Sequence, residues 1–430
     1  MKILVVGGGG REHALVRKIS AVPKVREIHC APGNAGIAAQ GVHCQPIKAT
    51  DIDAIVDYAK AHAFDLVVVG PDDPLAMGLT DALEAQGIPA FGPSKSAAAI
   101  ECSKVFAKEL MLNYGIPTAR HKSFTSHGAA VEYIRSLTEW PVVIKADGLA
   151  LGKGVIIAQD EAEALDALRQ MMEEKIFGAS GTNVVIEEFL TGPEVSVLAF
   201  CDGKTVVPMV SAMDHKRAFE GDAGPNTGGM GTVAPNPHYT PEMARRCTDE
   251  IFLPTVRAMQ AEKRPFKGCL YFGLMLTAQG PKVIEYNCRF GDPETQVILP
   301  LLESDIVEIM LAVHAGKLDE VDVKWKDGAC ACVVLASGGY PGSYPTGLPI
   351  EGLDATGQLP GGKVEIYHAG TRRDDRGRFL TAGGRVLGVT ATGADLTEAL
   401  ETAYSCVEEV SFQDIHYRKD IGGHREYALS

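Results

Sequence analysis

The stretch Val283-Ile-Glu-Tyr-Asn-Cys-Arg-Phe-Gly-Asp-Pro-Glu294 decides how the rest of the chain is interpreted. Its first half has the composition of a β-strand, in which successive side chains point to opposite faces. Alternation predicts one face that carries Glu285, Asn287 and Arg289, and an opposite face that is mostly apolar. Carboxylate and carboxamide oxygens suit a hard cation such as Mg²⁺, and a guanidinium suits a phosphate or a carboxylate. We expect a ligand-binding strand, because both flanks have the composition of a core.

The bulk composition is that of a soluble globular protein. The 430 residues are enough for about two to four domains, and 46% are hydrophobic and 22% charged. No run is apolar enough to span a membrane, and the apolar N-terminal run is too short for a signal-peptide core. The formal net charge of −14 disfavours nucleic-acid binding. The ten cysteines include no paired CxxC sets, which disfavours a zinc site and fits reduced thiols in a cytoplasmic compartment.

Residues 1–100 alternate strand and helix patterns, which predicts an open parallel sheet. The first strand leads through Gly7-Gly-Gly-Gly-Arg-Glu-His13 into a helix, the arrangement of an anion site. The dinucleotide fingerprint GxGxxG is not satisfied, because Glu12 or His13 stands at the third glycine position. We therefore expect this turn to bind a phosphate monoester or a pyrophosphate.

The central region contains a predicted flap. A helix is expected from Glu101 to Met111, followed by a strand that ends in Lys145. A glycine-rich loop over residues 146–154 then carries Lys153 near its tip and returns as a second strand. The P-loop pattern is not met, because the glycine spacing is one residue short and Gly154 replaces Ser or Thr. A mobile glycine lid over phosphates is the interpretation that we favour.

Two further central segments carry clustered charge. Residues 184–190 predict a strand that contains Glu187 and Glu188, of which at least one should face a polar ligand because burying both unpaired would be costly. Residues 214–231 form a long polar loop with Asp214, Lys216 and Arg217, a length typical of a functional lid. The opening stretch is expected to be the second strand of a hairpin whose first strand covers residues 269–276.

Short strands separated by glycine turns follow, at residues 329–336, 363–367 and 385–390, with a helix near 396–410. They predict a small α+β domain. His368, Arg372 and Arg373 are interpreted as solvated turn residues, and residues 418–422 as a segment that touches the cleft.

Several of these motifs together resemble a known family. They are Lys104, the Val-Ile-Lys-Ala-Asp-Gly-Leu-Ala-Leu-Gly-Lys-Gly flap, Ile-Glu-Glu-Phe-Leu, Asn-Thr-Gly-Gly-Met-Gly, and Glu-Tyr-Asn-Cys-Arg-Phe-Gly-Asp-Pro-Glu. The set is similar to the ATP-grasp superfamily and, more narrowly, to the phosphoribosylamine–glycine ligases, also called glycinamide ribonucleotide synthetases. Gly-Gly-Arg-Glu-His-Ala, Ala-Pro-Gly-Asn-Ala-Gly and Arg-Lys-Asp-Ile-Gly match the same family, so the resemblance runs from end to end.

The resemblance implies a reaction and a fold. Glycine, ATP and 5-phospho-D-ribosylamine would give glycinamide ribonucleotide, ADP and phosphate through a glycyl phosphate intermediate, in de novo purine biosynthesis. ATP with Mg²⁺ or Mn²⁺ would be the cofactors, and the enzyme would be a cytoplasmic monomer. The implied fold is multidomain α/β and α+β: a Rossmann-like domain over 1–100, an ATP-grasp domain over 101–325 with a mobile lid over about 120–190, and an α+β domain over 326–430.

The resemblance also implies roles for individual residues. The catalytic group would be Lys145, Asp214 and Arg289. Nucleotide binding would fall to Lys104, Lys145, Lys153, Glu187, Glu188, Phe189, Leu190 and Glu194. Substrate binding would fall to Gly8, Gly9, Gly10, Arg11, Asp214, Asn226, Thr227, Gly229, Met230, Arg289, Asp292 and Pro293. Metal binding would fall to Glu285 and Asn287.

Two departures from the family pattern stand out. Gly8 occupies a position where the family usually has asparagine. Backbone amides can still bind the phosphate without that side chain, so we expect only a side-chain contact to be lost. The superfamily's additional acidic metal ligand would fall at Leu274 or Met275, so Glu285 is the single protein carboxylate expected at the metal.

Other functions remain as alternatives. Another carboxylate–amine ligase of purine metabolism would share the nucleotide site but use different substrates, and a non-catalytic nucleotide or glycine sensor would not need the full set Lys104, Lys145, Glu285 and Asn287. A dehydrogenase is disfavoured by the missing third glycine. The ends of the chain, Met1 and Ser430, favour a free-standing enzyme.

Overall fold

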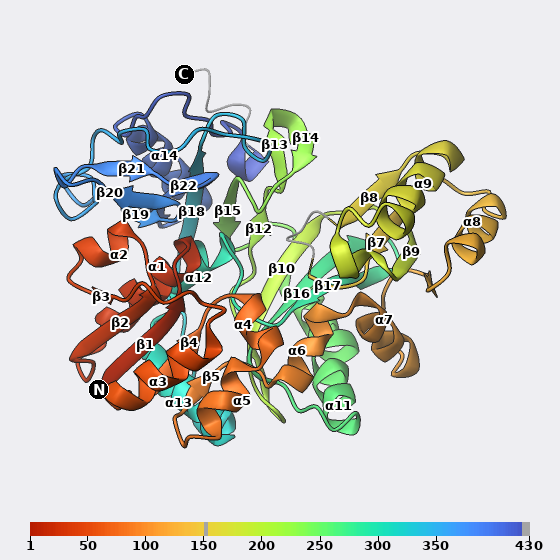
Figure 1. Ribbon diagram of the computed structural model, residues 1–430, viewed down its shortest axis with the longest axis horizontal. Helices are drawn as coiled ribbons and strands as arrows, with labels where there is room; N and C mark the ends of the chain where they lie inside the picture. The colour runs from red at the N-terminus through yellow and green to blue at the C-terminus, as the bar shows by residue number, and fades with distance from the viewer. Residues whose placement is uncertain (150–153, 424–430) are drawn as a thin grey trace.

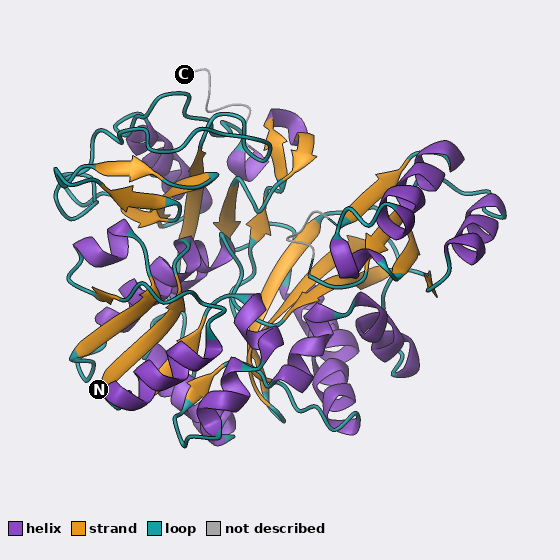
Figure 2. Cartoon of the chain, viewed as in Figure 1, coloured by secondary structure: helices purple, strands orange, loops and turns teal. Residues whose placement is uncertain are grey.

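The computed structural model describes residues 1–149 and 154–423. The N-terminal and C-terminal regions lie side by side on the left of Figure 1, and a separate lobe projects to the right. Strands continue from the centre of the molecule towards that lobe, whose helices cover its outer side (Figure 2). Within the described ranges, no helix combines the length and the apolar character that crossing a membrane would require.

The N-terminal region is an open parallel sheet, as predicted, with the strand order β3-β2-β1-β4-β5. Its strands are β1 (Lys2–Gly7), β2 (Glu27–Pro32), β3 (His43–Cys44), β4 (Leu66–Val69) and β5 (Ala90–Phe91). Its helices are α1 (Gly10–Ser20), α2 (Ala35–Ala39), α3 (Ile52–His62), α4 (Asp72–Met77), α5 (Leu79–Glu84) and α6 (Lys95–Cys102). The buried apolar strands make the sheet, and the glycine turn after β1 lies at its carboxyl edge.

The predicted helix from Glu101 to Met111 is two helices. α6 ends at Cys102, and α7 (Lys104–Asn113) begins after Ser103, which has an extended backbone with φ −130°. The Ser103 hydroxyl accepts a hydrogen bond from the Phe106 N–H, so it caps a new helix. The single-helix prediction is wrong for this reason, and the break places Lys104 in the first turn of α7.

The projecting lobe is a four-stranded sheet in the order β6-β9-β7-β8. Its elements are β6 (His121–Phe124), α8 (His127–Arg135), β7 (Val142–Ala146), β8 (Val155–Ala158), α9 (Glu161–Leu168) and β9 (Val184–Glu188). The predicted flap is the antiparallel pair of β7 and β8. Ile144 and Ile186 pack with helix residues in a core of the lobe's own, so Lys145 and Glu187 point to the other face.

The central sheet has the order β11-β10-β16-β17 and is antiparallel. Its strands are β10 (Glu194–Asp202), β11 (Val206–Pro208), β16 (Lys267–Thr277) and β17 (Gly280–Asn287), and its neighbouring helices are α10 (Pro241–Cys247), α11 (Leu253–Ala261), α12 (Glu294–Leu301) and α13 (Ile306–Ala315). β16 and β17 form the predicted hairpin. Their register passes from Gly273 opposite Glu285 to Leu274 opposite Val283, so Ile284 is an inserted residue.

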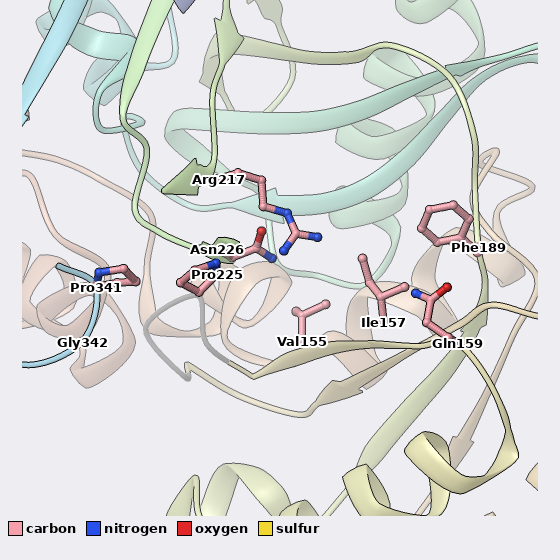
Figure 3. A pocket seen from close by; sticks show the side chains of 9 residues that line it. All are labelled: Val155, Ile157, Gln159, Phe189, Arg217, Pro225, Asn226, Pro341 and Gly342. Carbon is pink, nitrogen blue, oxygen red and sulfur yellow. The ribbon is translucent and has the colours of Figure 1, made fainter. Parts of the chain in front are cut away.

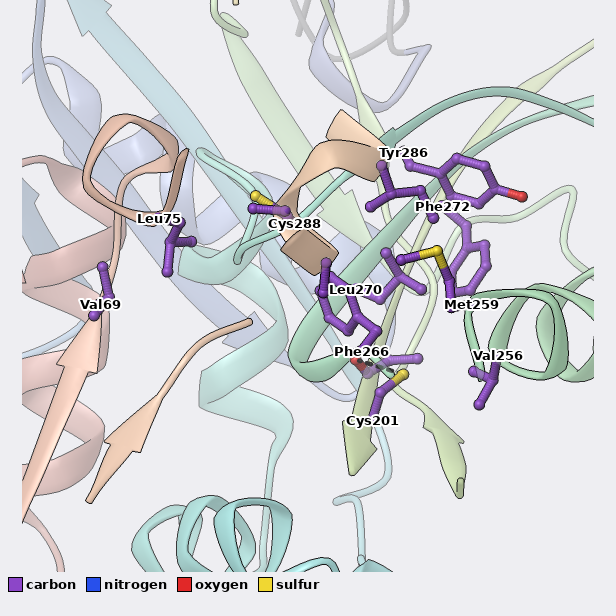
Figure 4. Packing of buried hydrophobic residues seen from close by; sticks show 14 of the residues in the cluster. Val69, Leu75, Cys201, Val256, Met259, Phe266, Leu270, Phe272, Tyr286 and Cys288 are labelled. Atoms are coloured by element: carbon purple, nitrogen blue, oxygen red, sulfur yellow. Dashed lines mark hydrogen bonds between the residues drawn. The ribbon is translucent and has the colours of Figure 1, made fainter. Parts of the chain in front are cut away.

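This bulge corrects simple alternation on β17. Alternation would place Val283 on the face of Glu285, but Val283 is fully buried in the core that contains Tyr286 and Cys288. The inserted Ile284 reverses the alternation, so the predicted polar face begins at Glu285. The same core includes Val69 and Leu75 of the N-terminal region, which therefore packs firmly against the central sheet (Figure 4).

The third sheet joins the central and C-terminal parts of the chain. Its order is β12 (Met213–Asp214), β15 (Gly231–Ala234), β18 (Ala329–Ala336), β22 (Arg385–Gly393) and β19 (Glu365–His368). Two hairpins, β13 (Arg217–Phe219) with β14 (Ala223–Asn226) and β20 (Thr371–Arg373) with β21 (Phe379–Thr381), and helix α14 (Leu396–Val407) complete it. Residues 214–231, predicted as one loop, thus contain strands, and β15 pairs with β18 across the predicted boundary at residue 325.

One C-terminal interpretation is wrong. His368 is completely buried, whereas Arg372 and Arg373 are exposed as expected. Its ring bonds to the Thr371 hydroxyl and the Gly357 carbonyl, and its backbone N–H donates to His13 Nδ1 at 2.8 Å. His368 is buried because it is the last residue of β19, a strand that packs beside α1.

Candidate active site

A cleft of about 930 Å³ opens between the lobe, the central sheet and the hairpin of β13 and β14. Of the residues singled out from the sequence, the following line it: Lys104, Lys145, Glu187, Glu188, Phe189, Leu190, Glu194, Asp214, Asn226, Thr227, Glu285, Asn287, Arg289 and Asp292. Arg418, Asp420 and Gly422 also line it, so the prediction that residues 418–422 touch the cleft is confirmed.

Strand β17 presents Glu285 and Asn287 to this cleft, and Arg289, two residues after the end of the strand, also lines it. Arg289 Nη2 pairs with Glu101 Oε1 at 3.2 Å, and Arg289 Nε is buried without a hydrogen-bond partner among the described residues. Glu101 also accepts a hydrogen bond from the Cys288 N–H at 2.6 Å. The guanidinium is therefore held from behind by α6 and keeps a donor for an anion.

Cations surround the Glu285 carboxylate. Lys216 Nζ lies 3.6 Å from Glu285 Oε1 and 3.3 Å from Glu194 Oε2. Burial opposes ionisation of Glu285, but Lys216, Lys145 and Lys104 outweigh it, so the pKa of Glu285 is below its usual value. Glu285 is thus a carboxylate at neutral pH with several ammonium groups beside it, where a triphosphate and its cation would both find complementary groups.

A buried ion cluster forms the base of the lobe. Glu187 is 4% exposed, and its two carboxylate oxygens lie 3.0 Å from Lys145 Nζ and 3.0 Å from Lys108 Nζ. Lys145 also donates to the Ile284 carbonyl, and Lys104 donates to the Gly148 carbonyl at 2.8 Å. Lys145 therefore bridges the lobe to β17, and Lys104 ties α7 to the flap.

The neighbouring acid, Glu188, has a different environment. Its carboxylate accepts from Arg120 Nε at 2.6 Å and from Lys282 Nζ at 3.1 Å. Burial opposes ionisation, but bonds from Arg120 and Lys282 lower the pKa of Glu188 to about 2. Beyond it, Phe189 is 40% exposed and faces Val155 and Ile157 across a hollow that continues from the cleft (Figure 3). These apolar side chains offer walls suited to a planar base.

Asp214 lies on the opposite side of the cleft, on β12. Its Oδ1 atom is buried and has no hydrogen-bond partner in the described parts of the chain. Burial and the nearby Glu294 raise the pKa of Asp214 well above its usual value, although Lys216 and Arg385 act in the opposite direction. A β-carbon at Gly229 would lie 2.6 Å from Asp214 Oδ1 and 2.4 Å from Pro293 Cδ, so the glycine lets the loop close over this carboxylate.

The glycine turn lies behind Asp292. The Gly9 N–H donates to Glu12 Oε2 at 2.6 Å, and the Arg11 N–H donates to Asp292 Oδ2 at 3.2 Å. The Arg11 guanidinium is buried against Glu12 and the Phe290 carbonyl. In this structure the turn is therefore linked to the cleft through Asp292, and the Arg11 side chain faces the interior.

The remaining predicted residues are placed as follows. Gly8, Gly9, Gly10, Arg11, Gly229, Met230 and Pro293 do not line the cleft themselves, and Met230 is fully buried. Lys153 lies outside the described residues. Met275 lines the cleft directly opposite Glu194, whereas Leu274 is buried. Of the two positions considered for a second metal-binding acid, only Met275 faces the cleft.

Sequence reasoning missed Glu101, Lys108 and Arg385. Arg385 Nη2 lies 3.4 Å from Asp292 Oδ1, and its Nη1 donates to the Asp292 carbonyl at 2.8 Å. Lys108 could have been found, since it lies one helical turn after Lys104 on the same face of α7. Glu101 and Arg385 meet their partners only through long-range packing, so no local signal identifies them.

Comparisons with known proteins agree with this geometry. Family models described as Phosphoribosylglycinamide synthetase match in three parts: the N domain at residues 1–101, the ATP-grasp (A) domain at 102–295 and the C domain at 330–424. The phosphoribosylamine–glycine ligase of Caldanaerobacter subterraneus is 49% identical over 98% of this chain and 99% of its own length. The trifunctional purine biosynthetic protein adenosine-3 of Gallus gallus is 47% identical over 98% of this chain and 42% of its own.

Solved structures give the same result. The phosphoribosylamine–glycine ligase of Thermotoga maritima superposes with a TM-score of 0.85 at 33% identity, over 98% of this chain and 100% of that one. A biotin carboxylase from Campylobacter jejuni superposes with a TM-score of 0.75 at 15% identity, over 97% of this chain and 92% of that one, which shows a shared fold.

Proposed function

The chain belongs to the phosphoribosylglycinamide synthetase (phosphoribosylamine–glycine ligase) family of ATP-dependent ligases in purine biosynthesis, and from this premise we propose how its cleft works. The reaction joins glycine to 5-phospho-D-ribosylamine with conversion of ATP to ADP and phosphate. The observation that carries the assignment is the meeting of Lys104, Lys145, Asp214, Glu285 and Arg289 in one cleft.

ATP would lie between the lobe and the central sheet. The backbone of residues 187–190 would contact the adenine, with Phe189 and Ile157 on its faces, and Glu194 would bind the ribose hydroxyls. Lys104 and Lys145 would hold the phosphates, and Lys153 would reach them from the flap. Because Lys104 and Lys145 are already tied to the flap and to β17, phosphate binding would draw the lobe towards the central sheet.

The residues on β17 fit a magnesium ion. Glu285 supplies an ionised carboxylate and Asn287 a carboxamide, and oxygen ligands of this kind suit Mg²⁺ or Mn²⁺. When bound, the ion would neutralise charge on the nucleotide phosphates. A single protein carboxylate implies that phosphates and water complete its ligands.

Glycine would bind beside Asp214. The partnerless Oδ1 atom of Asp214 is placed to accept from the glycine ammonium, and Arg289 retains a buried N–H for the glycine carboxylate or a phosphate. Asn226, Thr227, Gly229 and Met230 would close the loop over this amino acid, and Pro293 packs against Gly229. The arrangement brings the glycine carboxylate towards the phosphate-binding lysines, where positioning and charge neutralisation supply most of the catalysis.

The phosphosugar would approach from the N-terminal sheet. The turn from Gly8 to Arg11 would cradle its phosphate, and Asp292, tied to this turn, would contact the ribose. In the first step a glycine carboxylate oxygen attacks the γ-phosphorus and the bond to ADP breaks. In the second step the amine nitrogen of phosphoribosylamine attacks the acyl carbon, inorganic phosphate leaves, and the amine loses a proton.

Turnover tests the assignment of substrates. Release of phosphate and ADP from purified chain should require both glycine and freshly prepared phosphoribosylamine. ADP formation with another carboxylate and not with glycine would favour the alternative ligase, and binding without turnover would favour a sensor. A monomeric state and a cytoplasmic location stay predictions.

Substitution of Glu285 tests the metal assignment separately. Glu285→Gln keeps the shape but removes the one carboxylate, so we expect kcat to fall by about 100-fold or more and the Mg²⁺ concentration for half-maximal rate to rise. The measurement is phosphate release at increasing Mg²⁺. Glu188→Gln is the control, because this acid pairs with Arg120 and Lys282 and should leave the Mg²⁺ dependence unchanged.

A further inference from the structure

Two histidines and an acid come together on the N-terminal sheet, on residues that play no part in the reaction. Glu27 and His29 are two residues apart on β2 and so point to the same face. His43 on β3 is the register partner of His29, which places all three side chains on one face of the edge of the sheet. His29 contacts Tyr58 and His62 of α3, and none of the three residues lines the cleft.

We propose that Glu27, His29 and His43 form a binding site for one divalent transition metal of the zinc class. One ligand atom from each residue lies within 4.8 Å of the other two. Tetrahedral ligands about 2.1 Å from zinc are about 3.4 Å apart. Glu27 Oε1 and His29 Nε2, which are 2.7 Å apart, would open slightly to reach this spacing, and the wider pairs of the cluster would close by roughly 1 Å. His43 is exposed and Glu27 is half-buried, so both can move by this amount.

The buried member of the group is already oriented. His29 Nδ1 lies 2.5 Å from the Tyr58 hydroxyl on α3, and His29 Nε2 lies 2.7 Å from Glu27 Oε1. Metal-binding histidines usually bond through the second ring nitrogen to a partner that fixes the ring. Tyr58 fills that role here, and Nε2 points at the other ligands.

The hydrogen bonds of the cluster do not include the His43 side chain. Its ring centroid lies 4.8 Å from that of His29, yet the His43 side chain has no hydrogen bond or ion pair within the described residues. His62 and Phe64 also pack around His29, with ring centroids 5.4 Å and 4.9 Å away. A bound cation would use the free imidazole, and water would fill a fourth position.

The donor set determines the class of metal. Imidazole nitrogens prefer Zn²⁺, Co²⁺, Ni²⁺ or Cu²⁺ over Mg²⁺ and Ca²⁺, so this site and the cleft would select different ions. Lys2 Nζ lies 3.3 Å from the other Glu27 oxygen and opposes the cation, which implies weaker binding than at a structural zinc site. Our expectation of no zinc site rested on the absence of paired CxxC motifs, and a cluster assembled by strand pairing leaves no such motif.

A metal bound at this site would stabilise an edge strand of the sheet. β3 has two residues and pairs only with β2 in this sheet, so a metal shared by His29 and His43 would cross-link the two strands. Binding to the folded state alone stabilises it, so zinc should raise the thermal midpoint of the full chain.

Calorimetric titration of chelator-stripped full chain with Zn²⁺, in excess Mg²⁺ to occupy the cleft, tests the proposal. We expect one Zn²⁺ per chain, a visible ligand-field band with Co²⁺, and at least about 10-fold weaker binding in His43→Ala, with turnover unchanged. His127→Ala, which removes a histidine on the lobe, is the matched control and should bind like the wild type. Absence of stoichiometric binding, or equal affinity in His43→Ala and wild type, would overturn the proposal, as would equal weakening by His127→Ala.

Discussion

Removing the charge of Glu187 is expected to lower the free energy of unfolding at the base of the lobe. Glu187 holds two buried ammonium groups, Lys108 and Lys145, each at 3.0 Å. Glu187→Gln preserves the shape but leaves both cations without their anion. Loss of one partner from a buried ion pair costs about 3–5 kcal/mol, and we expect about 3 kcal/mol at pH 6, because Lys108 can lose its proton.

The pH dependence distinguishes this mechanism from a packing defect. Burial lowers the pKa of Lys108 to about 8, against the opposing effect of Glu187. Without Glu187 that pKa falls further, so at lower pH the folded variant binds fewer protons than the unfolded chain, and its stability rises with pH. The stability of the wild type rises with pH for the same reason only above about pH 8, the pKa of Lys108 in its folded state. The difference in stability between wild type and Glu187→Gln should therefore shrink between pH 6 and pH 8, by up to about 1.4 kcal/mol per pH unit for each group that titrates.

Hydrogen exchange of β7 and β9 in the native state measures the local opening free energy of the lobe. Glu188→Gln is the matched control, one residue away on the same strand. Its partner Arg120 is exposed and its partner Lys282 is partly exposed, so the substitution should cost at most about 1 kcal/mol with little pH dependence between pH 6 and 8. A Glu187→Gln penalty below that of Glu188→Gln, or one that stays constant from pH 6 to 8, would refute the reasoning.

Three further substitutions probe the cleft and the glycine turn behind it. Lys216→Met removes the cation between Glu194 and Glu285, so the pKa of Glu285 should rise and kcat should fall by about 10-fold or more, measured as a pH–rate profile. Asp214→Asn should raise KM for glycine by about 10-fold or more and leave KM for ATP near the wild-type value. In the wild type the affinity for glycine should rise with pH, because the raised pKa of Asp214 favours the protonated carboxyl at low pH and the carboxylate is the form that binds the ammonium. Gly8→Ala places a β-carbon 2.4 Å from the Gly33 carbonyl oxygen, so steady-state kinetics should show a higher KM for phosphoribosylamine alone and thermal unfolding a loss of about 1–3 kcal/mol.

Local signals predicted the elements that carry the site. The alternation of strands and helices over residues 1–100 followed from composition alone, and the parallel sheet with its buried strands β1 and β4 agrees with it. The hairpin of β16 and β17 followed from two apolar runs and a glycine turn. Each of these depends on residues that are neighbours in sequence, and so a single sequence contains the information.

Features that depend on distant contacts were not predictable. The Glu101–Arg289 pair joins α6 to the end of β17, and the alignment of His29 with His43 depends on strand pairing. Burial of His368 requires α1 beside β19, as the bond to His13 shows. The Gly8 departure also proved to involve the backbone, since any side chain there meets the Gly33 carbonyl, so more than a side-chain contact depends on it.

The bulge at Ile284 explains how one strand serves both a core and a cleft. It keeps Val283 in the core shared with Tyr286, and it turns Glu285 towards Lys216. Met275 stands where a second acid would face the same cleft, and Lys216, Lys145 and Lys104 favour the ionised form of Glu285. Beside Glu285 these ammonium groups oppose a bare divalent cation and attract a polyphosphate. The ion should therefore enter with the nucleotide, whose oxygens supply the ligands that the strand lacks.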